Sequence, residues 1–189
     1  MTRKIVVTGG LGGGKTTTVD LFQHEFRNLV SVVPEAATML FMGGVRRGGG
    51  PQSEAATQEA IFRLQCSLEG VFAAQNPERT LVCDRGTLDG VAYWPESEPE
   101  FFERMGSTCA RELSRYDAVI FFETGAGSNG DIRSNNPVRN ESNREAIELD
   151  QRLQEVWSRH PNYHFVQSSD SFLEKIRRGV DALTDALRS

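Results

Sequence analysis

The segment from Thr8 to Thr17 constrains this chain more than any other feature. It contains the pattern G-x-x-x-x-G-K-T and stands between an apolar run and an amphipathic helical pattern. A strand, a glycine turn and a helix N-terminus form the setting of a phosphate-binding P-loop, in which backbone N–H groups converge on an anion. The residues expected to hold a nucleoside triphosphate are Gly10, Leu11, Gly12, Gly13, Gly14, Lys15, Thr16 and Thr17.

Two side chains of this segment have expected roles of their own. Lys15 is expected to lie on an exposed loop and to reach the β- and γ-phosphates, which makes it a candidate catalytic residue. The hydroxyl of Thr16 is a candidate ligand of Mg²⁺. The alternative is a glycine-rich surface turn that happens to precede a Lys-Thr pair, but the strand before it and the helix after it favour the nucleotide site.

Lysine usage favours ATP as the nucleotide. The chain has only Lys4, Lys15 and Lys175 against eighteen arginines, and none of these lysines lies in the Asn-Lys-x-Asp segment with which Ras-type GTPases read guanine. The net charge of −5 argues against a general nucleic-acid surface. ATP and Mg²⁺ are therefore the expected cofactors, and nucleic acid is not an expected partner.

Length and cysteine usage indicate a small domain of the reducing cytoplasm. The 189 residues suit one domain, 1–189, acting as a monomer or homodimer. The three cysteines fit neither a zinc pattern nor a disulfide framework. No apolar run approaches the roughly 18 residues of a membrane span, and no signal-peptide pattern is visible, so no membrane partner is expected.

Apolar, β-branched runs alternate with helical patterns along the chain. This alternation predicts an α/β three-layer sandwich around a mostly parallel sheet. The expected strands are Ile5–Thr8, Val30–Val33, Thr80–Cys83, Ala118–Phe122 and Tyr163–Val166. The expected helices are Thr16–Phe26, Glu35–Met42, Glu54–Asn76, Pro99–Arg115, Asn143–Arg159 and Ser171–Leu187, the last capped by Ser169 or Asp170.

Two stretches lack any periodicity. Residues 43–52 are rich in glycine and arginine and are expected to form a flexible loop, and residues 124–142 are rich in Gly, Ser, Asn and Arg. Loops of this length in a compact domain are usually functional or disordered. The second stretch is therefore a candidate lid.

Acidic residues follow two of the expected strands. Asp84 follows the third, where P-loop proteins place a carboxylate of the Mg²⁺ site, although a turn-capping aspartate would fit there too. Glu35 follows the second, where a carboxylate could accept the proton of a hydroxyl that attacks the γ-phosphate. An acidic residue that only complements a helix dipole is the alternative for Glu35.

Arginines in or beside the candidate lid are suited to neutralise phosphoryl charge. Arginine offers planar donors to the equatorial oxygens of a transferring phosphoryl group. Arg139 ranks first because the adjacent Glu141 can orient it, and Arg144, at the start of the next helix, ranks second. A solvated charged loop is the alternative for both.

With these residues in place, the chain resembles the small P-loop kinases, namely the deoxynucleoside kinases, thymidylate kinase and the bacterial ribosylnicotinamide kinase domain. It is most similar to the single-domain bacterial AAA-like ATPases grouped near that last domain. The resemblance covers almost the whole chain. It rests on Gly9 to Thr17, Pro34-Glu35-Ala36-Ala37, Asp84-Arg85-Gly86, and Asn136-Pro137-Val138-Arg139 with Glu141.

The resemblance implies a fold and a set of roles. It implies a five-stranded parallel sheet of order 2-3-1-4-5, the P-loop NTPase fold. The implied roles are Glu35 as base, Thr16 and Asp84 as Mg²⁺ ligands, Arg85 as a contact to substrate or phosphate, and Arg139 as a lid residue. The acceptor stays open, because the second expected strand is not followed by the Glu-Pro of deoxynucleoside kinases, and the third is followed neither by their Glu-Arg-Ser nor by the Asp-Arg-Tyr of thymidylate kinases.

Three functions are compatible with these observations. The leading hypothesis is an ATP- and Mg²⁺-dependent phosphotransferase acting on a hydroxyl or phosphate of a small, nucleoside-like molecule. The small residues Ala36 and Ala37 beside Glu35 favour it, since they leave room for a substrate pocket. The runner-up is an ATP-hydrolysing switch without an acceptor. A polynucleotide 5′-kinase is the third, and the acidic charge balance disfavours it.

Overall fold

A five-stranded parallel sheet forms the centre of the molecule. The computed structural model describes residues 2–10, 12–125, 143–169 and 171–188. The strands are β1 (Lys4–Gly9), β2 (Val30–Val33), β3 (Thr80–Asp84), β4 (Ala118–Phe122) and β5 (Tyr163–Val166). They lie in the order β2-β3-β1-β4-β5, and every neighbouring pair is parallel. The sheet order expected from the resemblance is therefore confirmed.

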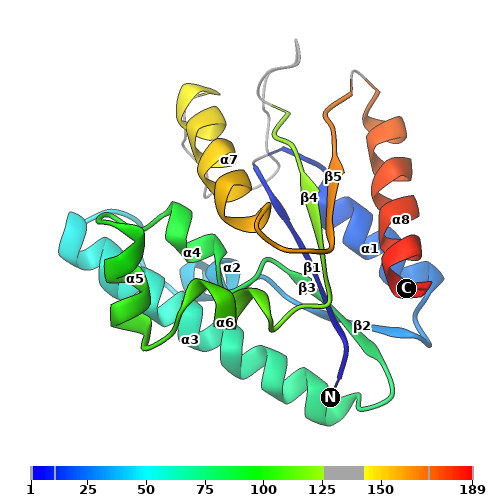
Figure 1. Ribbon diagram of the computed structural model, residues 1–189, viewed down its shortest axis with the longest axis horizontal. Helices are drawn as coiled ribbons and strands as arrows, with labels where there is room; N and C mark the ends of the chain where they lie inside the picture. The colour runs from blue at the N-terminus through cyan, green and yellow to red at the C-terminus, as the bar shows by residue number, and fades with distance from the viewer. Residues whose placement is uncertain (1, 11, 126–142, 170, 189) are drawn as a thin grey trace.

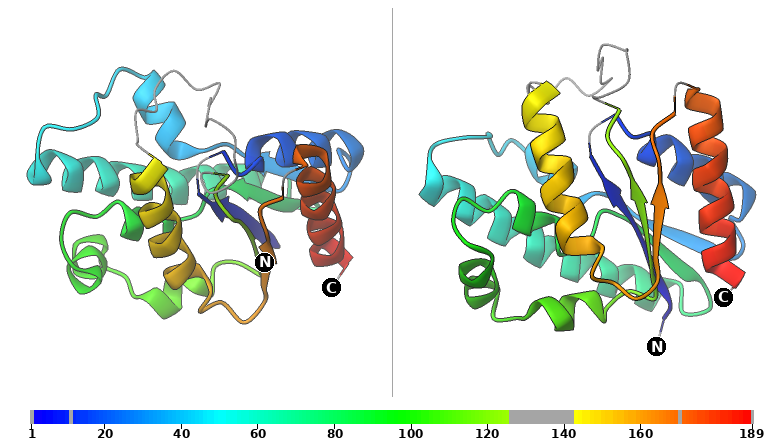
Figure 2. Two further views of the ribbon diagram at one scale, coloured as in Figure 1. Left: turned by 90° about the horizontal axis from the view of Figure 1, so that it is seen from above. Right: turned by 45° about the horizontal axis from the view of Figure 1, so that its top comes forward.

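Helices cover both faces of this sheet (Figures 1 and 2). One face carries α1 (Lys15–Glu25) and α8 (Phe172–Arg188). The other carries α3 (Pro51–Gln75), α4 (Asp89–Ala92), α5 (Glu98–Met105), α6 (Cys109–Leu113) and α7 (Asn143–Trp157). The short helix α2 (Ala36–Met42) follows β2 and packs beside α3. The result is the predicted three-layer α/β sandwich.

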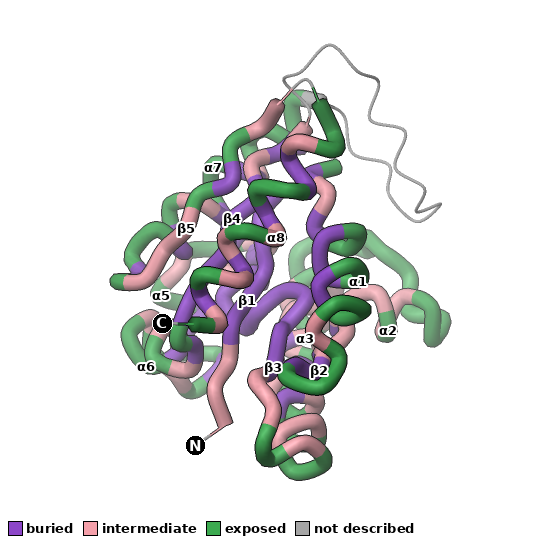
Figure 3. Tube along the Cα trace, turned by 90° about the vertical axis from the view of Figure 1, so that its right-hand side faces the viewer, coloured by how far each residue is buried: buried purple, intermediate pink, exposed green. Residues whose placement is uncertain are grey.

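The strands are buried from both sides because each face of the sheet has its own apolar core. Alternate residues of β1 point in opposite directions, with Val6 in the core beneath α3, α5 and α7 and Ile5 in the core beneath α1 and α8. All five residues of β4 are buried, which Figure 3 shows as a continuous buried stretch. Near-continuous apolar runs are what a doubly covered parallel sheet requires.

Several helix bounds differ from the sequence prediction. The single helix expected at Pro99–Arg115 is two helices, because Gly106 adopts a left-handed conformation with φ of 65° and ends α5. The short helix α4 was not predicted. The long helix begins at Pro51, so residues 51 and 52 of the expected loop belong to α3, whose first turn suits proline.

The last helix begins at a different cap from those predicted. The hydroxyl of Ser171 accepts a hydrogen bond from the backbone N–H of Glu174 at 3.3 Å, so Ser171 caps α8. Ser169 caps nothing in α8 directly, since its hydroxyl accepts from the backbone N–H of Ser171. The other predicted cap, Asp170, lies outside the described residues.

Candidate functional site

The glycine loop joins β1 to α1 and has the geometry of an anion cradle. Gly12 and Gly14 adopt left-handed conformations, with φ of 64° and 84°. Gly9 also has positive φ, and a Cβ added there would lie 2.0 Å from the carbonyl oxygen of Phe122 on β4. Only glycine fits such positions. Of the predicted contact residues, Leu11 lies outside the described residues, while Thr16 and Thr17 are exposed on the first turn of α1.

Lys15 is buried, which corrects the expectation of an exposed loop position. It is the first residue of α1, and its ammonium group donates a hydrogen bond to the carbonyl oxygen of Gly10 across the loop. Its side chain is directed backward because helical side chains lean toward the helix N-terminus, here toward the loop itself. The ammonium group thus already lies over the loop that would hold phosphates.

Thr16 and Asp84 bring two hard oxygen ligands together. Asp84 ends β3, beside β1 in the sheet, and the Thr16 hydroxyl lies 3.5 Å from its carboxylate oxygen Oδ2. Burial, and then the neighbouring carboxylate of Glu35, raise the pKa of Asp84 to about 6. A hydroxyl and a partly desolvated carboxylate form the donor set that Mg²⁺ prefers, so these residues fit the expected ion.

Glu35 and Arg85 meet at the same edge of the sheet. Glu35 precedes α2 and accepts a hydrogen bond from the hydroxyl of Thr38 at 2.6 Å. Its other carboxylate oxygen lies 3.4 Å from Nε of Arg85. The structure therefore brings the candidate base and the candidate substrate contact into one ion pair beside Asp84.

Arg85 is held in an unusual backbone conformation. Its φ of 76° is the only positive value among the described non-glycine residues, which marks a strained position of a kind found at functional sites. One guanidinium nitrogen, Nη1, donates to the carbonyl oxygen of Gly9 at 2.9 Å. The other, Nη2, is buried and has no hydrogen-bond partner among the described residues. This nitrogen is a donor available to a bound ligand.

Asp89 fixes this arrangement and was missed by the sequence analysis. It lies on α4 and accepts hydrogen bonds from Nη1 of Arg85 at 2.8 Å and from the hydroxyl of Thr8 at 2.7 Å. Its second oxygen accepts from the backbone N–H of Gly86 and from Nε1 of Trp157. The spacing of four residues from Arg85 was the available signal, but it becomes informative only once a helical turn is known to follow β3.

Asp150 was also missed, because nothing near it in the sequence points to the loop. It lies on α7, and one carboxylate oxygen accepts from the backbone N–H groups of Gly10 at 2.6 Å and Thr124 at 3.1 Å. Burial raises the pKa of Asp150 above its ordinary value. The helix that follows the candidate lid is thereby tied to the first part of the glycine loop.

Of the two candidate lid arginines, only Arg144 is among the described residues, and it is not brought to this site. Arg144 lies near the exposed start of α7, where it pairs with Glu148 at 2.9 Å. Arg139, with most of the candidate lid, lies outside the described residues, and only Thr124 and Gly125 of that stretch are described. Their proposed roles stay predictions.

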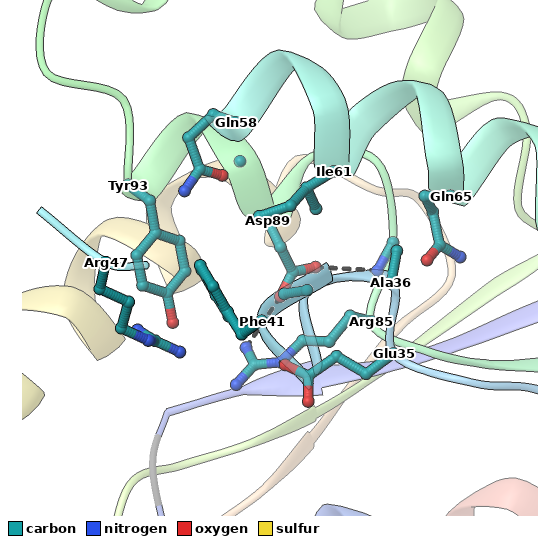
Figure 4. Close-up of a pocket in the computed structure, with 13 residues that line it drawn as sticks. Glu35, Ala36, Phe41, Arg47, Gln58, Ile61, Gln65, Arg85, Asp89 and Tyr93 are labelled. Atoms are coloured by element: carbon teal, nitrogen blue, oxygen red, sulfur yellow. Dashed lines mark hydrogen bonds and ion pairs between the residues drawn. The ribbon is translucent and has the colours of Figure 1, made fainter. Parts of the chain in front are cut away.

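A separate pocket opens beside Glu35 and Arg85, between α2, α3 and α4 (Figure 4). Its lining combines two carboxylates, two guanidinium groups, two amides and two aromatic rings with small and aliphatic residues. The lining residues are Glu35, Ala36, Ala37, Phe41, Arg47, Gln58, Ile61, Gln65, Arg85, Gly86, Asp89, Gly90 and Tyr93. Figure 4 shows Glu35 and Arg85 side by side at one end and Gln58 projecting from α3.

The fold and the glycine loop together define a class of protein. A parallel sheet of order 2-3-1-4-5 with this loop after β1 is the fold of the P-loop NTPases, which bind nucleoside triphosphates. A family model described as an AAA domain matches residues 4–175, and the chain belongs to this family. No curated protein matches the chain. None of the helices that the structure describes is long and apolar enough to cross a membrane.

Proposed function

We propose that the chain is an ATP- and Mg²⁺-dependent phosphotransferase that acts on a small acceptor. The observation that carries this proposal is the separate pocket that shares Glu35 and Arg85 with the nucleotide site. Arg85 touches the glycine loop through Gly9 and Glu35 through its Nε atom. A protein that only hydrolyses ATP does not need a second pocket beside its nucleotide site.

In this proposal, some residues bind the nucleotide and its metal ion, and others contact the transferred phosphoryl group or the acceptor. Lys15 and the loop N–H groups hold the β- and γ-phosphates, and Thr16 and Asp84 hold Mg²⁺. The ion, when bound, neutralises charge on the phosphate oxygens. The buried Nη2 of Arg85 is placed to donate to the transferred phosphoryl group or to the acceptor, and Arg139 and Arg144 are proposed to add charge from the lid side.

Glu35 is the proposed general base for this transfer. An acceptor oxygen in the pocket forms a bond to the γ-phosphorus, the bond to the β,γ-bridging oxygen breaks, and ADP leaves. The acceptor's hydroxyl proton passes to the Glu35 carboxylate, which Thr38 and Arg85 hold in place. Holding the base on two elements of the scaffold keeps it within reach of the hydroxyl.

The test compares Glu35→Gln with the wild type. We expect turnover with an acceptor to fall by about 10²- to 10⁴-fold while the affinity for ATP stays the same, because the variant loses the base but no phosphate contact. ADP release with a panel of small alcohols and phosphates measures turnover, and calorimetry measures ATP affinity. Glu25→Gln, at the exposed end of α1, is the control. ADP release that no acceptor accelerates would favour the ATP-hydrolysing switch.

A further inference from the structure

The turn that follows β3 keeps Arg85 in a strained backbone conformation. Its φ of 76° lies in the left-handed region, and such a residue persists only where the surrounding structure holds it. The backbone N–H of Arg85 donates to the carbonyl oxygen of Val7 at 2.9 Å, and that of Gly86 donates to Oδ2 of Asp89 at 3.0 Å. Further support comes from outside the turn and from outside the neighbouring strand.

Two aromatic side chains from distant parts of the chain hold this turn. Tyr116, between α6 and β4, accepts a hydrogen bond from the backbone N–H of Thr87 at 2.9 Å. Trp157, the last residue of α7, donates from Nε1 to Oδ2 of Asp89 at 3.2 Å. The two rings meet edge to face with their centroids 5.5 Å apart, and both residues are buried. Close packing therefore fixes the two polar groups that reach the turn.

The backbone beside Arg85 lies directly against these two rings. A Cβ added to Gly86 would lie 2.8 Å from Cη2 of Trp157 and 2.9 Å from the hydroxyl oxygen of Tyr116. Contacts this close leave the peptide no room to move toward α7, which also packs against α4. The position of the indole thus limits where the backbone of Arg85 can lie.

Asp89 passes this restraint to the guanidinium of Arg85. Its Oδ1 accepts from Nη1 of Arg85 at 2.8 Å and from the hydroxyl of Thr8 at 2.7 Å. Its Oδ2 accepts from the backbone N–H of Gly86 and from Nε1 of Trp157. A carboxylate has about four acceptor positions, so this one cannot turn without breaking a buried hydrogen bond. Because the guanidinium is planar, a fixed Nη1 also fixes the direction of Nη2, the buried donor without a partner among the described residues.

We propose that Trp157 is a positioning residue for phosphoryl transfer: its indole N–H orients Asp89, and Asp89 holds Arg85 so that Nη2 points at the reacting phosphate or the acceptor. This inference rests on the proposed phosphotransferase function. Neither Trp157 nor Tyr116 is among the described residues that line the pocket, so both act only through the turn. The alternative is that Asp89 merely satisfies a buried indole N–H, and that this hydrogen bond matters for folding alone.

The test compares Trp157→Phe with Trp94→Phe. Both tryptophans are buried and meet another aromatic ring edge to face, and both substitutions remove the same atoms. Nε1 of Trp94 has no hydrogen-bond partner among the described residues, whereas Nε1 of Trp157 donates to Asp89. The pair of variants therefore separates the loss of the hydrogen bond from the loss of ring volume.

The first measurement is the ¹H–¹⁵N NMR signal of the Arg85 guanidinium, identified by its absence in Arg85→Lys. The spectra are recorded with Mg²⁺ and a non-hydrolysable ATP analogue, and they need no acceptor. We expect the signal to shift or broaden in Trp157→Phe, because the guanidinium then samples more than one orientation. In Trp94→Phe the signal should keep its wild-type position and width.

The second measurement is turnover, followed as ADP release with an acceptor that accelerates it. We expect kcat to fall by roughly 10- to 100-fold in Trp157→Phe, because a displaced donor no longer meets the charge that develops in the transition state. The KM for ATP should stay within about twofold of the wild type, since the phosphate contacts of the glycine loop are kept. Trp94→Phe should turn over as the wild type does.

A tryptophan analogue keeps the test open if Trp157→Phe does not fold. Since the chain has two tryptophans, Trp157 is the only one left in Trp94→Phe. Growth of that variant on 3-benzothienylalanine, in which sulfur replaces the indole N–H, therefore changes residue 157 alone and keeps its ring shape. The same changes in the Arg85 signal and in kcat are expected.

The outcomes separate this inference from the function beneath it. An Arg85 signal and a kcat that do not change in Trp157→Phe, or that change equally in Trp94→Phe, overturn the inference and leave phosphotransfer standing. A displaced signal with an unchanged kcat also overturns it, because the reaction then does not depend on where Arg85 is held. If no acceptor accelerates ADP release, the phosphotransferase fails, while a displaced signal in Trp157→Phe alone still supports the hold of Trp157 on Arg85.

Discussion

At the scale of single residues, the ionised form of Asp84 suits cation binding but lowers the stability of the folded protein. Its pKa is raised from 3.8 to about 6, by burial first and then by Glu35. The protonated form therefore favours folding fully below about pH 4, and this contribution is lost as the pH rises through about 6. An ionised Asp84 at neutral pH is ready to bind a cation but destabilises the ligand-free fold.

Asp84→Asn is expected to make the ligand-free protein more stable at pH 7.5, by on the order of 2 to 3 kcal/mol, because the amide stays neutral. The gain should shrink as the pH falls toward about 4, where wild-type Asp84 is protonated too. Urea unfolding across this pH range measures the difference. Asp20→Asn, on the exposed face of α1, is the control. The ATP affinity of the same Asp84 variant should no longer depend on Mg²⁺. A variant whose ATP affinity still depends on Mg²⁺ as in the wild type would show that Asp84 does not bind the ion.

At the scale of elements, Asp150 couples α7 to the glycine loop. Asp150→Ala removes the carboxylate oxygen that accepts from the backbone N–H groups of Gly10 and Thr124, and leaves Gly10 its longer hydrogen bond to the carbonyl oxygen of Phe122 at 3.2 Å. We therefore expect a loss of about 1 to 3 kcal/mol in the free energy of unfolding. A loosened loop should also lower ATP affinity by about tenfold, or roughly 1.4 kcal/mol. Asp150→Asn keeps an acceptor oxygen, so this variant should retain most of the wild-type stability and most of the wild-type ATP affinity. Equal effects of the two substitutions, measured by urea unfolding and calorimetry, would show that the charge matters rather than the hydrogen bonds.

Gly106 separates α5 from α6 by conformation alone. A Cβ added there would meet nothing within 4 Å, but the φ of 65° is strained for any other residue. Gly106→Ala should therefore cost about 1 kcal/mol in thermal or urea unfolding. Gly70→Ala offers the opposite control, because Gly70 lies within α3, its added Cβ also meets nothing within 4 Å, and alanine favours a helix by about 1 kcal/mol. Changes of the same sign in both variants would contradict this explanation.

The elements that the sequence predicted well are those with a local cause. The apolar runs of β1 and β4 and the glycine loop between β1 and α1 carry their pattern in consecutive residues, and all lie where expected. The break at Gly106 was missed because helical periodicity continues across it. The short helix α4 was missed because four residues carry too little pattern to register.

At the scale of the whole molecule, the site exists because parallel strands end at one edge. Lys15 and Glu35 follow β1 and β2, and Asp84 is the last residue of β3. This order along the chain was enough to predict that they lie at the same edge of the sheet. Asp89 and Asp150 could not be predicted this way, because their contacts depend on how α4 and α7 pack onto the sheet. The pocket is formed by α2, α3 and α4 together, so no single segment of the sequence predicts it.

A buried charge cluster beneath the pocket holds separate parts of the chain together. Glu69 of α3 is fully buried and accepts hydrogen bonds from Lys4 at 2.9 Å, Arg115 at 2.7 Å and Tyr116 at 2.8 Å. Burial alone would raise the pKa of Glu69, but Arg115 and Lys4 lower it below its ordinary value. The ionised carboxylate therefore contributes stability above the ordinary pKa of a glutamate, and this contribution is lost as the pH falls through the lowered value.

Glu69→Ala should consequently destabilise the entire fold, since it leaves Lys4 and Arg115 without a partner that joins them to α3. We expect a loss of about 3 to 5 kcal/mol in urea unfolding at pH 7.5, with the gap to the wild type narrowing in acid. The matched control is Glu59→Ala on the same helix, which also pairs with two arginines, Arg63 and Arg104, but at the surface. Exposed pairs contribute less than about 1 kcal/mol. Similar losses in both variants would mean that burial adds nothing to the stability contributed by the Glu69 cluster.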